Sequence, residues 1–169
     1  MKKLIFFLII FSTFIQSANT EIVYIDINSI LNKSEVGKSL NDFLEKMNNK
    51  NIEKYKPIEA QLIKKEKELI AQQNILAKEE FQKKLTALTA EVQKYRSDKK
   101  ISSEELNKVK VEKTKEIFKV LNPIITKYVD LNSISLVIPK KNIIVGKKNL
   151  DITEQIIQLL NNDINKLKF

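Results

Sequence analysis

The sequence predicts an α+β protein in which a long antiparallel helical hairpin extends from a small β-sheet body. Three observations support this prediction. The 169 residues include only two glycines and three prolines, which favours long helices over a loop-rich fold. Apolar residues recur at spacings of three and four through residues 35–130. Short segments rich in β-branched residues lie before and after this stretch, where they predict strands.

The first residues have the order of a secretory signal. Two lysines precede an apolar run from Leu4 to Phe11, and the small residues Ser17 and Ala18 follow. An apolar run of this length is too short to span a bilayer. We therefore expect residues 1–18 to be removed on export, with an uncleaved membrane anchor as the alternative.

The composition bears on the chemistry that the exported chain can perform. Without residues 1–18 it holds 28 basic and 21 acidic residues, a net charge of +7. It has no cysteine and no histidine, so it lacks disulfides, the usual metal ligands and the commonest general base. Gly37 and Gly146 are isolated and form no phosphate-binding loop. We expect no enzymatic activity, no metal and no cofactor.

The predicted body is formed by residues 19–34 and 131–160. At its start, residues 21–27 read EIVYIDI and are apolar at alternating positions on both faces, which predicts a strand buried on both sides. A short helix is expected next, from Ser29 to Leu31.

The later part of the body predicts a hairpin and a final helix. Residues 133–145 read SISLVIPKKNIIV, two apolar runs separated by a polar turn that begins at Pro139, which is typical of a β-hairpin. Asp151 and Glu154 have the spacing of a capping box and predict the start of a helix. We expect residues 161–169 to form a frayed tail.

The chain between these two parts predicts the helical hairpin, over residues 35–130. Its two arms need similar lengths to leave the sheet and return, because an α-helix rises about 1.5 Å per residue. The apolar phase also resets between Leu76 and Phe81, so we place the tip at about 75–80. The predicted apolar seam, which is also a candidate contact surface for a partner, consists of Tyr55, Ile58, Leu62, Leu69, Leu76, Phe81, Leu85, Leu88, Val92 and Tyr95.

A polar stretch, YRSDKKISSEE at 95–105, interrupts this seam. With the tip placed as above, residues whose numbers sum to about 155 lie opposite each other, which pairs the stretch with NKNIEKYKP at 49–57. Pro57 has no N–H and clashes with the preceding helical turn. Lys99 and Ser102 stand where seam residues are expected. We interpret this level as a flexible band across the arm, with coincidence as the alternative.

The segments that flank the hairpin carry a family resemblance. The motifs before it are Tyr24-Ile25-Asp26, Ile30-Leu31-Asn32 and Gly37-Lys38. The motifs after it are Asn122-Pro123-Ile124-Ile125, Leu136-Val137-Ile138 and Asp151-Ile152-Thr153. In these motifs the chain resembles the OmpH-like periplasmic chaperones, the Skp family, and the resemblance extends over essentially all of the chain after residue 18.

The resemblance implies a homotrimer in which strands of three copies form a small barrel with three tentacle-like arms. The arms would enclose a cavity in the periplasm that holds unfolded outer-membrane β-barrel proteins without ATP. Unpaired edges of so small a sheet agree with trimerisation. The residues expected to build the trimer body are Ile22, Tyr24, Ile25, Ile134, Leu136, Ile138 and Ile144.

Other functions compete with this expectation. A structural or tethering coiled coil of the cell envelope would fill the apolar seam with one fixed partner. Nucleic-acid binding is suggested by the basic composition, but the leader and the interspersed charges argue against it. Weak contact with membrane lipid or lipopolysaccharide is a further expectation, and the densest basic group is Arg96, Lys99 and Lys100, for which a solvated helix face is the alternative.

Overall fold

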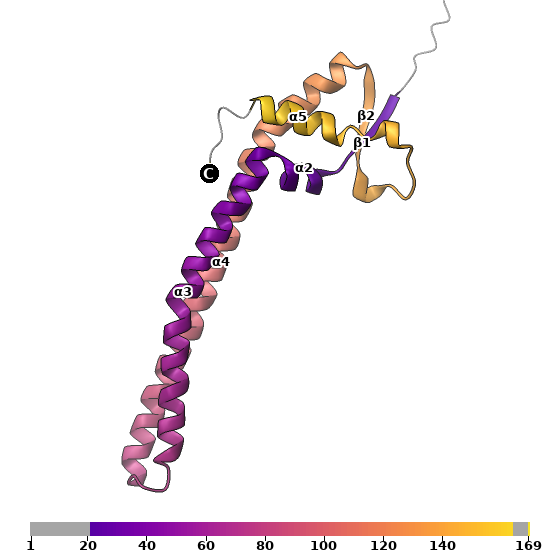
Figure 1. Ribbon diagram of the computed structural model, residues 1–169. Helices are drawn as coiled ribbons and strands as arrows, with labels where there is room; N and C mark the ends of the chain where they lie inside the picture. The colour runs from indigo at the N-terminus through magenta and orange to yellow at the C-terminus, as the bar shows by residue number, and fades with distance from the viewer. Residues whose placement is uncertain (1–20, 164–168) are drawn as a thin grey trace, which may run out of the picture.

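The computed structural model describes residues 21–163 and Phe169, so the predicted leader at 1–18 lies outside the described residues. The described chain is a long helical arm with a small body at one end (Figure 1). Its elements, in order, are β1 (Glu21–Ile25), α2 (Ile27–Lys33), α3 (Glu35–Ala71), α4 (Lys78–Leu131), β2 (Ile134–Pro139), the 3-10 turns η1 (Lys140–Asn142) and η2 (Lys148–Leu150), and α5 (Thr153–Asp163).

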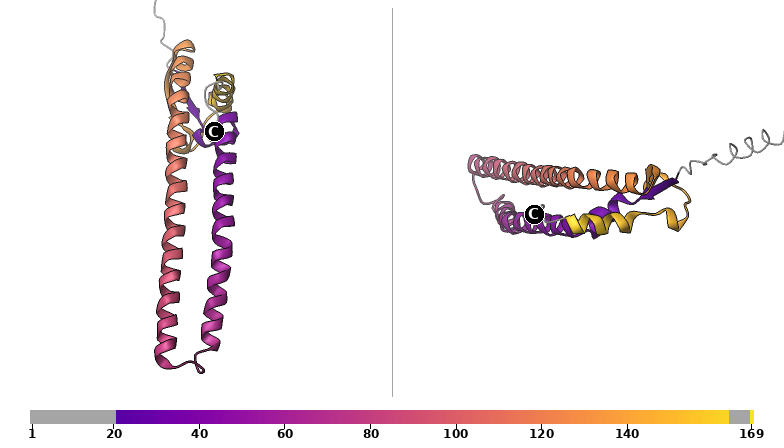
Figure 2. Two further views of the ribbon diagram at one scale, coloured as in Figure 1. Left: turned by 90° about the vertical axis from the view of Figure 1, so that its left-hand side faces the viewer. Right: turned by 90° about the horizontal axis from the view of Figure 1, so that it is seen from above.

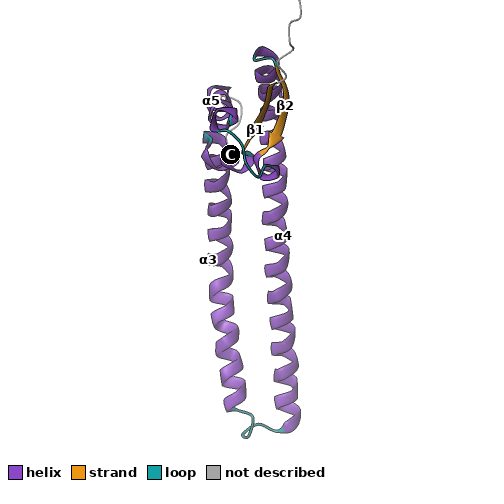
Figure 3. Ribbon diagram, turned by 90° about the vertical axis from the view of Figure 1, so that its right-hand side faces the viewer, coloured by secondary structure: helices purple, strands orange, loops and turns teal. Residues whose placement is uncertain are grey.

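The arm consists of α3 and α4, which run antiparallel and side by side with a short loop at residues 72–77 between them (Figure 2). The predicted helical hairpin on a small sheet is therefore confirmed. α3 has 37 residues and α4 has 54. They differ because the last part of α4 continues past the start of α3 and becomes part of the body (Figure 3). For this reason the loop lies well before the midpoint of 35–130.

Both helices pass through positions where the sequence suggests a break. Pro57 lies inside α3, and the polar stretch 95–105 lies inside α4. α3 begins at a capped end, because the Ser34 hydroxyl accepts a hydrogen bond from the backbone N–H of Gly37 at 3.1 Å. The level that the sequence marks as flexible is thus helical in both halves of the arm.

The hydrophobic core lies in the body, where α4 meets elements from both ends of the chain. The fully buried side chains of Ile117 and Leu121 come from α4, and those of Ile156 and Leu160 come from α5. Ile30 of α2 is fully buried with them. Each such side chain contributes roughly 1.5–3 kcal/mol through its removal from water. The core therefore ties the start, the middle and the end of the chain into one unit.

The sheet has two parallel strands, β1 and β2, with Ile22 opposite Leu136 and Tyr24 opposite Ile138. The direction follows from the length of α4, which carries the chain beyond the sheet. The chain reverses at Asn132 and Ser133, where Ser133 adopts a φ of 53°, and β2 then runs back beside β1. At Tyr24, β1 also pairs with Asp151, and the N–H of Ile152 donates to the Tyr24 carbonyl at 3.0 Å.

The predicted β-hairpin at 133–145 is wrong in its second half. After Pro139 the chain forms η1, and Ile144 and Val145 lie in a loop, 101% and 89% exposed. The loop is held at its base by Tyr24, whose hydroxyl donates to the Lys147 carbonyl at 3.3 Å and whose ring packs on Gly146. This contact holds the chain beside β1, on the side away from β2 where Asp151 pairs with Tyr24. The segment after Pro139 therefore does not pair with β2 as a second strand of a hairpin.

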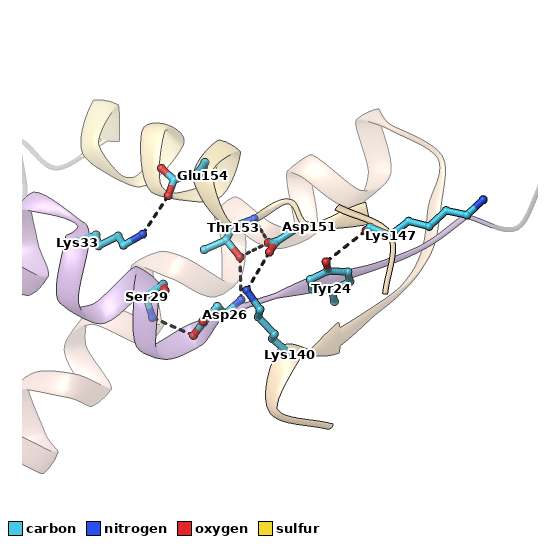
Figure 4. Close-up of polar contacts among 9 residues, drawn as sticks. All are labelled: Tyr24, Asp26, Ser29, Lys33, Lys140, Lys147, Asp151, Thr153 and Glu154. Atoms are coloured by element: carbon cyan, nitrogen blue, oxygen red, sulfur yellow. Dashed lines mark hydrogen bonds and ion pairs between the residues drawn. The ribbon is translucent and has the colours of Figure 1, made fainter. Parts of the chain in front are cut away.

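The junction between β1 and the last helix is built from polar contacts (Figure 4). An Asp26 carboxylate oxygen caps α2 by accepting from the Ser29 N–H at 3.0 Å, and the Asp26 N–H donates to the Thr153 hydroxyl at 2.9 Å. Asp151 accepts from the N–H and the hydroxyl of Thr153 and from Lys140. The bond from the Ser29 N–H lowers the pKa of Asp26. These contacts fix the direction in which α2 and α5 leave the sheet.

The predicted frayed tail, 161–169, is wrong at both of its described parts. α5 continues through Asn161 to Asp163, and an Asn161 side-chain oxygen accepts from the Glu35 N–H at 2.9 Å. This bond satisfies an N–H at the start of α3 that has no partner within the helix. Phe169 packs against the core. Residues 164–168 lie outside the described residues.

Replacing Gly37 with alanine is expected to destabilise the body strongly. A β-carbon at this position would lie 1.9 Å from the backbone oxygen of Leu31, where α2 and α3 approach each other. Backbone must move to relieve such an overlap, so the free energy of unfolding should fall by about 3 kcal/mol. Urea unfolding followed by circular dichroism measures this loss.

The matched control is Lys38→Ala, because Lys38 is the next residue along α3 and is exposed. Its free energy of unfolding should stay within about 0.5 kcal/mol of the parent protein. Equal unfolding midpoints for the two variants would show that the close contact at Gly37 carries no such constraint.

Candidate functional site

The arm buries a narrow apolar seam between its two helices. Of the predicted seam residues, Tyr55, Leu62 and Leu69 of α3 are buried. Ile58 and Leu85 are exposed at 38% each. The others are half-buried, namely Leu76, Phe81, Leu88, Val92 and Tyr95. The three buried residues on α3 are seven positions apart, which is a spacing of coiled-coil packing, whereas Ile58 and Leu85 do not share this burial.

A second row of apolar side chains on the arm is exposed, and none of its members belongs to the predicted seam. Ile63 and Ile70 each follow a buried seam leucine by one position, and Ile52 precedes Tyr55 by three. Two helices cannot cover more than one narrow stripe on each other, so these neighbours of the seam face solvent. The repeat of isoleucine directly after Leu62 and Leu69 is the signal that could have revealed them.

Polar contacts also join the two helices, and they agree with the predicted pairing of residue numbers. Lys65 and Glu91 form an ion pair at 2.6 Å. Near the tip, the Lys84 ammonium group donates to the Gln72 side-chain oxygen at 3.1 Å. Such exposed contacts each contribute little to stability. They nevertheless fix which residues of α3 and α4 lie at the same height.

The most extensive contacts across the arm lie at mid-height, in what we call the mid-arm network: Tyr55, Glu59, Tyr95, Asp98 and Lys99. The Tyr55 hydroxyl donates to the Asp98 backbone carbonyl at 3.0 Å, and the Tyr95 hydroxyl donates to a Glu59 carboxylate oxygen at 2.7 Å. Lys99 donates to the Tyr95 hydroxyl at 3.1 Å and lies 3.6 Å from Glu59. The two tyrosine rings meet edge to face at 6.1 Å.

The network shifts the ionisation of its charged members. The hydrogen bond from Tyr95, and then the charge of Lys99, lower the pKa of the Glu59 carboxyl. The same tyrosine, and then the charge of Glu59, raise the pKa of Lys99. Lys99, predicted as part of a flexible band, is therefore a member of a network that connects the helices.

A cavity of about 330 Å³ opens between the helices on the body side of this network. We call it the mid-arm cavity. Its walls include Asn48, Asn51, Ile52, Ser102, Ser103 and Leu106. Ser102 thus lines an open space, whereas Pro57 is an exposed residue of α3 outside the lining. A second gap between the helices, of about 290 Å³, lies nearer the tip and is lined by charged side chains such as Lys65 and Glu91. The mid-arm cavity differs from it in its asparagine and serine lining.

The body exposes apolar residues on and beside the sheet. Ile22 and Leu136, which are opposite each other in the strand register, are 46% and 50% exposed. The loop residues Ile144 and Val145 of the body are exposed as well. Three other residues predicted for the trimer body are not on this exposed surface. Tyr24, Ile25 and Ile134 are buried within the single chain. Ile138 is half-buried.

The described residues offer no site for a metal ion. Within 21–163 and Phe169, no three histidine, cysteine or acidic side chains are grouped so that they could hold one. No helix in the same part of the chain combines the length and the apolar character needed to cross a bilayer.

The fold is a long helical hairpin that extends from a small body of two strands and short helices, and comparisons with known proteins identify its family. The family model described as "Outer membrane protein (OmpH-like)" matches residues 21–160, and the chain belongs to this family. The fold is similar to that of a candidate outer membrane chaperone (OmpH-like) from Caulobacter crescentus CB15. That similarity has a TM-score of 0.72 and 16% identity, and covers 89% of each chain. The sequence matches no curated protein.

The mid-arm network is expected to give the arm a pH-dependent stability. The pKa of Glu59 lies below its ordinary value of 4.5 in the folded arm. Its contribution is therefore present above pH 4.5 and is lost as the pH falls through the lowered folded pKa. The pKa of Lys99 lies above 10.5, so its contribution is complete below pH 10.5 and is lost as the pH rises through the raised value.

The test is urea unfolding of the parent protein and of Glu59→Gln at pH 7 and pH 3. The variant should be the less stable protein at pH 7, and this difference should shrink at pH 3. Glu66→Gln is the control, because Glu66 lies on the same helix outside the network. A Glu59→Gln difference that stays constant between the two pH values would rule out this role of the carboxylate.

Proposed function

We propose that this protein is a periplasmic chaperone that holds unfolded outer-membrane β-barrel proteins without ATP. The observation that carries the proposal is the arm itself, which presents apolar side chains such as Ile52, Ile63 and Ile70 to solvent along its length. α3 alone spans about 55 Å at 1.5 Å per residue. Exposed apolar residues spread over this distance provide many weak contacts, which suit a chain without fixed structure.

Three further observations support the proposal. The chain belongs to the OmpH-like family, and the similar Caulobacter protein is described as a candidate chaperone. The N-terminal sequence pattern is that of an exported protein. The excess of basic residues would attract acidic partners at a distance, with an effect that falls as salt is added.

The arms act together in this proposal, because the chain forms a homotrimer through its body. Ile22 and Leu136 form an exposed apolar pair on the sheet, and Ile144 and Val145 are two further exposed apolar residues of the body. A two-stranded sheet also leaves the outer edge of β2 without a partner strand among the described residues. Copies of the chain that cover this edge and these side chains would remove both from solvent. Three arms would then enclose the space that holds the client.

Weak contact with membrane lipid or lipopolysaccharide also stays a proposal. Of the basic group Arg96, Lys99 and Lys100, two members have acidic partners within the arm. Lys99 pairs with Glu59, and Lys100 pairs with Glu104. These ion pairs favour a solvated helix face for the group over a dedicated lipid site.

The chaperone proposal is tested by diluting a urea-unfolded outer-membrane β-barrel protein into buffer and measuring light scattering. Excess chaperone should suppress the scattering equally with and without ATP, and several unrelated barrels should be protected. Unchanged scattering, or protection that needs ATP, would contradict the proposal. Protection of a single partner would favour the tether instead.

The trimer is tested by changing its proposed apolar surface. The double variant Ile22→Lys and Leu136→Lys should have the mass of one chain in light scattering coupled to size-exclusion chromatography, whereas the parent should have the mass of three. Ile63→Lys is the control, because Ile63 is 46% exposed on the arm, away from the body. A parent protein that stays a monomer at all concentrations would exclude the trimer.

The flexible band is tested by hydrogen exchange. Pro57 removes a helical hydrogen bond, and Ser102 borders a cavity where the seam is interrupted. Amides at 48–57 and 97–103 should therefore exchange faster than those at 62–72 and 83–93. Slower exchange at the mid-arm level would mean that the network outweighs the cavity and that the arm does not bend there.

A further inference from the structure

We propose that the mid-arm cavity is a binding slot for the peptide backbone of an unfolded client. The inference rests on the proposed chaperone function and adds a place on the arm and a chemistry of recognition. The cavity volume of about 330 Å³ falls at the lower end of the range of about 300–1,000 Å³ that is usual for ligand sites. It suits a short extended segment of a chain.

The slot exists because two seam positions carry short polar side chains. Asn51 precedes the buried Tyr55 by four residues on α3, and Ser102 follows Tyr95 by seven on α4. Both spacings are those of the seam, but neither side chain can fill the space that a leucine would occupy. Tyr55 is also in the lining, and its bond to the Asp98 carbonyl holds it against α4 on the tip side.

The lining matches the groups that every peptide bond presents. An asparagine side chain carries one acceptor oxygen and two N–H donors, which complement the N–H and C=O of a backbone amide. Asn48 and Asn51 supply such groups from α3, and Ser102 and Ser103 supply hydroxyls from α4. Ile52, which is 51% exposed, and Leu106 provide apolar surface for a client side chain.

The serine hydroxyls are available for this role. The hydroxyls of Thr86 and Thr89, nearer the tip on α4, donate to the backbone carbonyl four residues earlier. Ser102 and Ser103 make no such bond to any described residue. A hydroxyl that is not used by its own helix can bond to a ligand. Recognition through backbone groups would also be independent of client sequence, which a chaperone for different proteins requires.

The charges around the slot favour an uncharged ligand group. The charged residues of its lining are Lys56, Lys99 and Glu59, and Lys99 is paired with Glu59. A site for phosphate or carboxylate would present unpaired basic groups that converge on one point. Lys56 forms no ion pair with a described residue, so the lining has one excess positive charge, but a single exposed lysine does not gather several basic groups at one point. The lining therefore fits the neutral amides of a peptide backbone better than an anion.

The test compares two matched double variants. Asn51→Ala with Ser102→Ala removes polar groups from the slot, whereas Asn49→Ala with Ser97→Ala removes the same groups from exposed positions outside the lining. Both variants gain the same helix propensity, so their arms should stay folded. The probe is a urea-unfolded, fluorescently labelled outer-membrane β-barrel protein. The slot variant should bind it about tenfold more weakly, and the control variant should bind like the parent.

Site-specific crosslinking supplies an independent readout. The chain has no cysteine, so a photo-crosslinker can be attached at Ser103→Cys in the slot or at Ser97→Cys outside it. The client should crosslink several-fold more from position 103. Equal yields, together with equal affinities of the two double variants, would overturn the slot while leaving the chaperone proposal intact. A parent protein that binds no client would overturn both.

Discussion

The packing of α4 against both ends of the chain is the interaction on which the rest of the structure depends. Ile117 and Leu121 have no exposed surface, and they share one core with Ile30 near the start and Leu160 near the end. The arm lies between these segments in the sequence, so closing the core means closing a loop of more than 80 residues. The helical hairpin makes that closure possible, because it returns the chain to its starting point with most of its residues already ordered.

The direction of α4 then determines that the two strands are parallel and which apolar residues of the body stay exposed. Because α4 continues past the body before the chain reverses, β2 runs parallel to β1. Tyr24 and the segment around Asp151 hold the far edge of β1, and the loop with Ile144 and Val145 is left outside the chain's own core. The apolar surface that we assign to contacts between copies is thus a consequence of how one chain closes its core.

The arm is governed by a different balance, because two helices can bury only a narrow seam. Below mid-height, Leu62 and Leu69 hold the helices together through apolar burial. At mid-height, polar groups take over, with Tyr55 and Glu59 bonded across the arm. Just above them the seam is absent and the mid-arm cavity opens. With the mid-arm network beside the mid-arm cavity, the arm can bind a ligand in the cavity. It can also bend at this level while the network keeps the two helices together.

The sequence by itself determined the helical hairpin, its pairing and the family to which the chain belongs. The hairpin and its pairing follow from local information, because apolar spacing sets the helix faces and, around a given tip, an antiparallel pair places residues with a constant number sum opposite each other. Only the tertiary structure decided the parallel sheet, the loop at Ile144, the capping of α3 by Asn161 and the mid-arm cavity. Each of these depends on contacts between residues far apart in the chain, and no local pattern records which distant group will satisfy a strand edge or a free N–H.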